Sequence, residues 1–292
     1  MSANAINPPV LVGIDGSDAA AEAVRWAAVE AAHHQAPLHI VYCIGAPMDF
    51  GPGIAFNQID YDTYRAAGAA SVAAAREFAT AATTPVGELD ITTFVVEAPP
   101  IPVLLERSTD ARLLVVGTRG LGAFRRGLLG SVSTAVARHA HCPVAVIPEP
   151  ENYTPDRLLG PVLVGVDGSA SSSRAIEIAF DEADRRDVAL RAVLTWSELN
   201  RYIPRADLQQ EAEELLSESL AGYAEKYPDL EVQRVVAEDR PTRRLLAESA
   251  LAQLIVVGSH GRGGFAGMTL GSVSQAVLHA IDCPIIIARP QN

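Results

Sequence analysis

Val10-Leu-Val-Gly-Ile-Asp15-Gly-Ser17 recurs almost unchanged as Val162-Leu-Val-Gly-Val-Asp167-Gly-Ser169, and this repeat is the strongest indication of the fold. Each version is a short, β-branched apolar run that ends in aspartate and glycine, which is typical of a buried strand followed by a turn. A stretch repeated at such a distance indicates a duplicated domain. The chain therefore contains two copies of one folding unit.

Two further pairs of stretches repeat in the same order. Leu114-Val-Val-Gly117-Thr-Arg-Gly120 corresponds to Ile255-Val-Val-Gly258-Ser-His-Gly261, and in both copies nine residues separate the second glycine from Gly-Ser-Val-Ser. A Cys-Pro pair closes each copy. We expect a first domain over residues 1–148, a linker rich in proline and charge over 149–159, and a second domain over 160–292.

Short apolar runs alternate with longer stretches rich in Ala or Glu within each copy. This alternation indicates βαβ units around a parallel sheet, and continuously apolar runs indicate strands that helices cover on both faces. The predicted strands are 10–15, 38–44, 89–96, 113–117 and 144–147 in the first copy, and 162–167, 189–195, 231–237, 254–258 and 285–288 in the second. The fold class expected is α/β, with five strands per copy.

The composition disfavours several classes of function. The 292 residues carry 35 acidic and 23 basic side chains, so binding to nucleic-acid phosphates would have to overcome a net charge of −12. Every apolar run is shorter than the ~18 residues of a membrane span, and the first residues lack the pattern of a signal peptide. Three cysteines are too few for a disulfide framework. We expect a cytoplasmic protein with no nucleic-acid or membrane partner.

The glycine motif lies where parallel sheets bind ligands, outside the carboxyl ends of the strands. Gly130 and Ser131 come directly before a helical stretch, so their amides and the hydroxyl can meet a phosphate at a helix N-terminus. Asp15 and Asp167 end the first strand of each copy, where a carboxylate can bond a ribose or help to hold a phosphate-bound Mg²⁺. Purely structural roles are the alternatives to ligand binding, in which Gly130 forms a tight turn and the aspartates take part in capping the following helices.

A strand ending in Asp, then Gly-x-x-Gly, nine residues and Gly-Ser, resembles the ATP-binding branch of the universal stress protein family. The resemblance covers nearly the whole chain, once in each copy, and the chain closely resembles the tandem-domain members found in actinobacteria. It implies two tandem Rossmann-like domains, each a five-stranded parallel sheet of order 3-2-1-4-5 flanked by helices. ATP would lie across the carboxyl ends of strands 1 and 4 of each sheet.

The resemblance also implies two sets of cofactor-binding residues, with adenine near Cys43 in the first copy and near Thr195 in the second. The first set is Gly13, Asp15, Cys43, Gly117, Arg119, Gly120, Arg125, Arg126, Gly127, Gly130, Ser131, Val132 and Ser133. The second set is Gly165, Asp167, Thr195, Gly258, His260, Gly261, Arg262, Gly271, Ser272, Val273 and Ser274. The family often has His between the paired glycines, where this chain has Arg119 and His260. Arg125 and Arg126 are interpreted as phosphate contacts, with a solvated loop face as the alternative.

Competing motifs find little support. A Walker A loop needs Gly-Lys, but the only lysine is Lys226 and no glycine precedes it. Residues 261–266 match the letters of the dinucleotide-binding pattern, yet they follow the fourth strand of their copy. His139, His141 and Cys142 resemble a ligand cluster, but residues two apart on a helix point to nearly opposite sides. We expect no metal site there.

The leading hypothesis is an ATP-binding regulator of stress response or growth, with one ATP per domain, Mg²⁺ as counterion and an unidentified protein partner. The absence of an activated nucleophile or a general-base pair beside the motif argues against rapid turnover. The alternative is a slow, Mg-dependent ATP-hydrolysing or nucleotidyl-transferring enzyme. A third hypothesis is a binding platform without ATP, or one selective for a cyclic nucleotide.

Two expectations follow for assembly and for variants. Each copy ends with a short apolar edge strand, 144–147 or 285–288, so we expect a homodimer or a pairing of the two copies. A bulky residue at Gly117 or Gly130 is expected to block the first site alone, and one at Gly258 or Gly271 the second.

Overall fold

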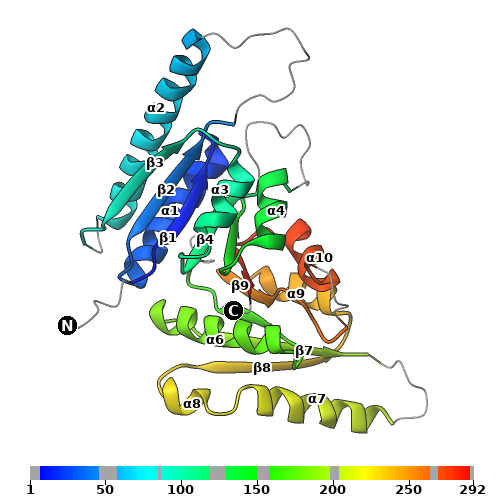
Figure 1. Cartoon of the computed structure of the whole chain (residues 1–292). Coiled ribbons are helices and arrows are strands. Elements are labelled where there is room, and N and C mark those ends of the chain that lie inside the picture. Colours follow the sequence, from blue (N-terminus) through cyan, green and yellow to red (C-terminus); the bar gives the residue numbers. More distant parts are fainter. Residues whose placement is uncertain are drawn as a thin grey trace, which may run out of the picture. The chain divides into compact units, whose positions relative to one another are not determined.

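The computed structural model describes residues 7–45, 58–84, 87–118, 129–149, 158–197, 204–263 and 269–289, with the side chains of 58–61 excepted. The chain divides into two compact units, Met1–Glu149 and Pro150–Asn292, and Figure 1 shows the elements of each. Most of the predicted linker lies outside the described residues.

Unit 1 alternates strands with helices. Its elements are β1 (Val10–Ile14), α1 (Asp18–His33), β2 (Leu38–Cys43), α2 (Gln58–Thr83), β3 (Ile91–Val96), α3 (Pro100–Arg107), β4 (Leu113–Gly117), α4 (Ser131–His139) and β5 (Val144–Ile147). The strands run parallel in the order β3-β2-β1-β4-β5.

Unit 2 repeats this arrangement. Its elements are β6 (Val162–Val166), α6 (Ala170–Arg185), β7 (Leu190–Trp196), α7 (Arg205–Ser219), α8 (Tyr223–Lys226), β8 (Val232–Glu238), α9 (Pro241–Ser249), β9 (Leu254–Gly258), α10 (Ser272–Ala280) and β10 (Ile285–Ala288). The order β8-β7-β6-β9-β10 is again parallel. The predicted α/β class, the strand order and all ten predicted strands are confirmed, with strand ends shifted by one or two residues.

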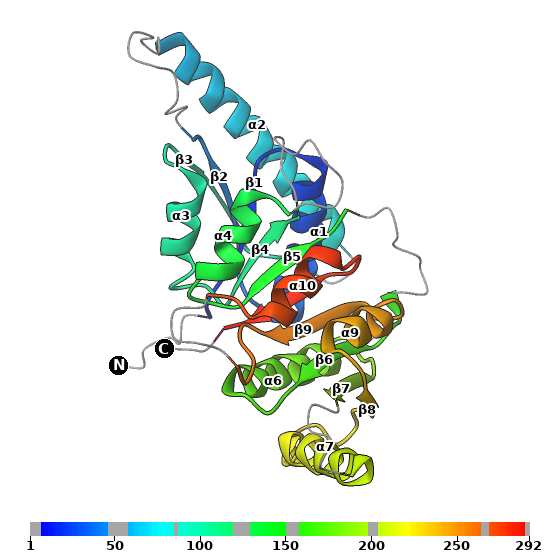
Figure 2. The same ribbon diagram turned by 90° about the vertical axis from the view of Figure 1, so that its right-hand side faces the viewer.

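Helices cover both faces of each sheet. In unit 1, α1 and α2 pack together on one face and α3 and α4 on the other, as Figures 1 and 2 show. In unit 2, α6 and α7 face α9 and α10 across the strands. The central strands are consequently apolar along their length, and Leu113–Val116 are buried throughout. Full burial of such a side chain contributes about 1.5–3 kcal/mol, so the unbroken apolar runs stabilise the sheet centre.

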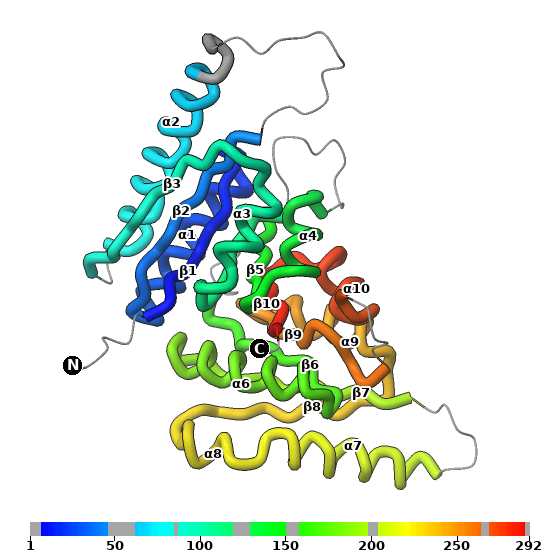
Figure 3. Tube along the Cα trace, viewed as in Figure 1, coloured from blue at the N-terminus to red at the C-terminus, as the bar shows by residue number. Residues whose placement is uncertain are grey.

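The two units differ most between their second and third strands. Helix α2 has 26 residues, whereas α7 has 15 and is followed by the four-residue α8, as the tube in Figure 3 traces. The ring of Phe180 stacks on Tyr223 at 4.4 Å and on Tyr227 at 5.5 Å between ring centroids, which packs α8 against α6. The shorter second copy thus replaces one long helix with a broken one. No helix of the described part is both long and apolar enough to cross a membrane.

Candidate functional site

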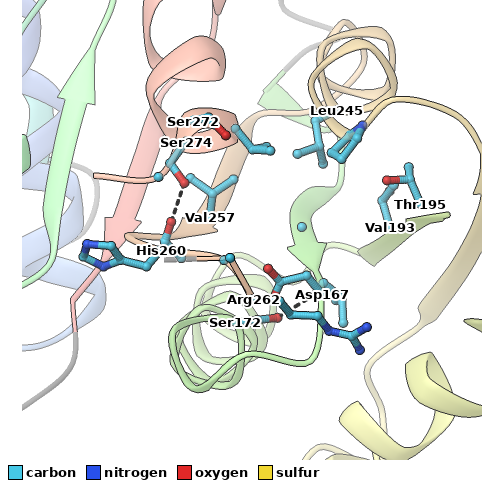
Figure 4. Close-up of a pocket in the computed structure, with 18 residues that line it drawn as sticks. Asp167, Ser172, Val193, Thr195, Leu245, Val257, His260, Arg262, Ser272 and Ser274 are labelled. Carbon is cyan, nitrogen blue, oxygen red and sulfur yellow. Dashed lines mark hydrogen bonds between the residues drawn. The ribbon is translucent and has the colours of Figure 1, made fainter. Parts of the chain in front are cut away.

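A cavity of about 290 Å³ lies at the carboxyl ends of β6, β7 and β9 in unit 2 (Figure 4). Residues from these strand ends, from the loop after β9 and from the start of α10 line it together. Its lining includes every residue predicted for the second site: Gly165, Asp167, Thr195, Gly258, His260, Gly261, Arg262, Gly271, Ser272, Val273 and Ser274. The fold therefore brings the separated motifs of the second copy to one place.

The same cavity has an apolar wall that the sequence analysis missed. Val193, Pro241 and Leu245 form this wall, with Val166 and Val257 beside them. Pro241 and Leu245 lie one turn apart on α9 and so share a face of the helix. The sequence indicated this wall only through position. Val193 and Thr195 lie two residues apart on β7 and so share one face of the sheet, and α9 follows β8, the strand next to β7.

The N-terminus of α10 opens onto the cavity without a capping side chain. Gly271 is the N-cap residue, and its own amide donates to the carbonyl of Ser259 at 2.7 Å, which joins the two ends of the loop. In unit 1 the amide of Gly130 donates to the carbonyl of Thr118 at 2.8 Å, and α4 also lacks a side-chain cap. Uncapped first-turn amides and the positive end of the helix dipole suit an anion.

Ser133 and Ser274, both predicted as ligand contacts, form internal hydrogen bonds. Their hydroxyls donate to the carbonyl oxygens of Gly117 and Gly258, each at 2.6 Å, and both side chains are buried. In Figure 4 the dashed line from Ser274 marks this bond in unit 2. These serines tie the first turn of the helix to the end of the central strand.

Replacing Ser274 with alanine is expected to destabilise unit 2 by about 1–3 kcal/mol, since a buried carbonyl loses its donor. Urea unfolding followed by circular dichroism measures the change. Ser272→Ala is the matched control, because Ser272 is exposed on the same helical turn, and its effect should stay within about 0.5 kcal/mol. Equal stability of the two variants would contradict the role assigned to this bond.

The two aspartates organise the turn after the first strand of each unit. Oδ1 of Asp15 accepts the Ser17 amide at 3.0 Å, and Oδ1 of Asp167 accepts the Ser169 amide at 2.9 Å. Ser17 and Ser169 then cap α1 and α6. The capping alternative is therefore part of the structure. In Asp167 this bond uses Oδ1.

The second oxygen of Asp167 faces the loop after β9. A Cβ atom added at Gly261 would lie 2.7 Å from Asp167 Oδ2, so only glycine fits at this position without a shift. The Arg262 guanidinium lies against the turn at Gly168, where an added Cβ would be 2.8 Å from Nη2. One carboxylate and one guanidinium thus stand at the same edge of the cavity.

Gly117 and Gly258 have a packing role that was not predicted. A Cβ at Gly117 would lie 2.8 Å from the carbonyl oxygen of Ala19, and one at Gly258 would lie 2.9 Å from the carbonyl carbon of Ser171. These glycines let the central strand end approach the backbone of α1 or α6. A side chain there would clash with the helix that covers the sheet.

His260 lines the cavity largely through its backbone. Its imidazole Nδ1 lies 3.0 Å from Oγ of the fully buried Ser259, and in Figure 4 the ring is turned away from Asp167 and Thr195. The carbonyl of His260 accepts a bond from Ser169 Oγ at 3.4 Å. The imidazole is therefore poorly directed to act on a group held in the cavity.

Part of the predicted first site can be placed in unit 1. Arg119, Gly120, Arg125, Arg126 and Gly127 lie outside the described residues. The others occupy positions equivalent to those of the second site, at the ends of β1, β2 and β4 and the start of α4: Gly13, Asp15, Cys43, Gly117, Gly130, Ser131, Val132 and Ser133. Burial raises the pKa of Cys43 to about 11, although nearby Arg107 acts against this shift. A neutral thiol therefore stands where unit 2 has the hydroxyl of Thr195.

The two histidines near the end of α4 differ from the neighbouring cysteine in solvent exposure. His139 and His141 are exposed, whereas Cys142 is buried. The backbone amide of His141 donates to Ser108 Oγ at 2.9 Å. The expectation that these three residues hold no metal stays a prediction.

Two units, each a parallel sheet of strand order 3-2-1-4-5 with helices on both faces, define a tandem α/β protein. The sequence profile of the Universal stress protein family matches residues 7–148 and 159–289, and the chain belongs to that family. Universal stress protein Rv2005c of Mycobacterium tuberculosis is 46% identical over 284 residues, covering 96% of each chain. Universal stress protein Rv2623 of the same species is 41% identical over 290 residues, again covering 96% of each.

A solved structure has the same architecture along the whole chain. The crystal structure of a universal stress protein from Archaeoglobus fulgidus superposes with a TM-score of 0.71 and 20% sequence identity, covering 97% of this chain and 96% of that one. This likeness supports the tandem fold.

Proposed function

We propose that the protein binds ATP with Mg²⁺, one nucleotide in each unit, and acts as a nucleotide-dependent regulator of stress response or growth through a protein partner. The observation that carries the proposal is the unit 2 cavity, which combines an apolar wall, a carboxylate and an uncapped helix N-terminus. A nucleotide has the matching three parts: a flat base, a ribose and an anionic phosphate chain.

Each part of the nucleotide has a candidate partner. The base fits between Val193, Leu245 and the hydroxyl of Thr195, because ligand pockets combine apolar walls with a few polar groups. The carboxylate of Asp167 can accept from the ribose hydroxyls. The phosphates fit the first-turn amides of α10. Mg²⁺, when bound, would offset phosphate charge, with Asp167 as its candidate protein ligand.

A regulatory role is favoured over rapid catalysis by the groups around the cavity. The Ser259–His260 contact has the form of a nucleophile and base, but Ser259 is fully buried and cannot reach a ligand. Among the described lining residues, Asp167, His260 and Arg262 are the ionisable ones. Slow ATP hydrolysis or nucleotidyl transfer assisted by Asp167 remains the alternative function.

The nucleotide content of the purified chain tests the proposal. We expect ATP to co-purify, and calorimetric titration of the stripped protein with ATP and Mg²⁺ to give two nucleotides per chain. Cyclic AMP and GTP titrated in the same way distinguish ATP from the other nucleotide classes. Binding of one nucleotide per chain, or of none, would contradict the proposal. Turnover of about 1 s⁻¹ or more, within the usual range of enzymes, would favour the enzyme alternative.

A further inference from the structure

Arg262 supplies a permanent positive charge at the rim of the unit 2 cavity. It shares the lining with Asp167 and His260, and the His260 ring is turned away from Asp167 and Thr195. An arginine side chain stays charged and presents a planar fork of donors, which matches phosphate oxygens. Among the described lining residues, Arg262 is therefore the one cation directed to act on a bound anion.

The guanidinium of Arg262 is available to a ligand. Several other arginines of unit 2 are paired with a carboxylate, as Arg191 is with Glu248 at 2.9 Å. Within the part of the chain that the structure describes, no hydrogen bond or ion pair holds the Arg262 side chain. Its Nη2 would lie 2.8 Å from a Cβ added at Gly168, and in Figure 4 the side chain runs beside Asp167. The guanidinium can therefore move towards a phosphate without breaking an ion pair.

The backbone of Arg262 lies close to the helix start that suits the phosphates. A Cβ added at Gly271, the N-cap residue of α10, would lie 3.5 Å from the amide nitrogen of Gly261, the residue before Arg262. A Cβ added at Gly263 would meet no described atom within 4 Å, so the loop leaves space on the other side of Arg262. The long side chain can thus swing from Gly168 towards the first turn of α10.

The size of the cavity places the outer phosphates of a triphosphate near Arg262. The cavity volume of about 290 Å³ lies at the lower limit of the ~300–1,000 Å³ found for pockets that enclose most of a ligand. The enclosed part therefore suits a nucleoside with its first phosphate, and a longer phosphate chain has to continue past the rim. Arg262 and Gly263 are exposed at this rim.

We propose that Arg262 is the specificity-determining residue of the second site: it binds the phosphates beyond the first, so that this site favours nucleoside triphosphates over monophosphates. The inference rests on the proposed function, because it requires a nucleotide in the cavity. The guanidinium leaves Gly168 and forms bidentate, charge-assisted hydrogen bonds to the outer phosphate oxygens. A monophosphate ends at the first turn of α10 and gains nothing from this contact. The sequence of the first copy has Leu121, outside the described residues, at the corresponding position.

Calorimetric titration of the full-length Arg262→Leu variant with ATP and Mg²⁺, and separately with AMP, tests the proposal. Loss of a charge-assisted contact is expected to weaken ATP binding about 10- to 100-fold at one of the two sites per chain, whereas AMP binding is unchanged at both. Arg262→Lys keeps the charge without the planar fork, so its ATP affinity should be intermediate. Arg234→Leu is the matched control, because Arg234 is an exposed arginine of unit 2 outside the cavity lining.

The outcomes separate this proposal from the proposed function. An unchanged preference for ATP over AMP in Arg262→Leu, with two nucleotides still bound, would overturn the role of Arg262 and leave the proposed function intact. Equal weakening of ATP and AMP, or the same loss of ATP affinity in Arg234→Leu, would also overturn that role. An unaltered chain that binds no ATP would contradict the proposed function itself, and this inference with it. Circular dichroism checks folding, and Arg262→Gln replaces the leucine variant if that variant does not fold.

Discussion

Replacing Gly117 with valine is expected to destabilise unit 1 by about 3 kcal/mol or more, the upper part of the range for overpacked sites. The new side chain would meet the Ala19 backbone at 2.8 Å, and backbone on a packed helix cannot rotate away as a flexible side chain can. The lowered unfolding midpoint of unit 1 in urea, followed by circular dichroism, measures the effect. The same reasoning applies to Gly258→Val in unit 2.

This expectation corrects the selective block predicted from the sequence for these two glycines. A bulky residue at Gly117 or Gly258 would disturb the packing of its whole unit, so lost ligand binding there would report on folding. Gly271→Ala is the matched control, because its Cβ would lie no closer than 3.4 Å to its neighbours. If Gly117→Val unfolds at the same urea concentration as the unaltered chain, the packing role is wrong.

Replacing Gly271 with valine is expected to reduce the number of ATP molecules bound per chain from two to one. The nearest neighbours of an added Cβ are His260 Cα and the Ser259 carbonyl oxygen, both at 3.4 Å. The two further methyl groups of valine would therefore crowd the loop at the start of the uncapped helix α10. A phosphate group has to approach the backbone amides of this first helical turn. Calorimetric titration measures the stoichiometry.

Two comparisons make this result interpretable. Gly271→Ala should retain both nucleotides with a modest loss of affinity, and the unfolding midpoint of Gly271→Val should stay close to that of the unaltered chain. Retention of both nucleotides by the valine variant would show that this loop does not hold phosphate. Loss of both would show that the two sites are not independent.

The strands, and the gathering of the second set of residues around one cavity, could be predicted because they depend on local patterns. Continuous apolar runs such as Leu113–Val116 have few alternatives to a buried parallel strand. Glycines and aspartates at strand ends are chemically distinctive, and the parallel sheet gathers all strand ends on one edge. A repeated motif in a regular sheet therefore predicts a repeated site.

The apolar wall and the packing roles could not be predicted, because the residue types involved are ambiguous. Val193 and Leu245 have the same character as core residues, and only the three-dimensional structure shows that they border a cavity. Gly258 and Gly271 look alike in sequence. Gly258 lies against the backbone of α6, however, whereas Gly271 has room for an added Cβ atom. Ser274 likewise bonds a carbonyl and Ser272 is exposed.

The hydrogen bonds that join Thr118 to Gly130 and Ser259 to Gly271 have a consequence for how the two copies can evolve. Because both ends of each loop are anchored, insertions or substitutions between them leave the strand and the helix in place. Doubling such a loop adds only about 0.6 kcal/mol of closure cost. The first loop already carries Arg125 and Arg126 where the second has Ala266 and Gly267. Gene duplication has thus provided two frames in which ligand preference can diverge under separate selection, without loss of the shared fold.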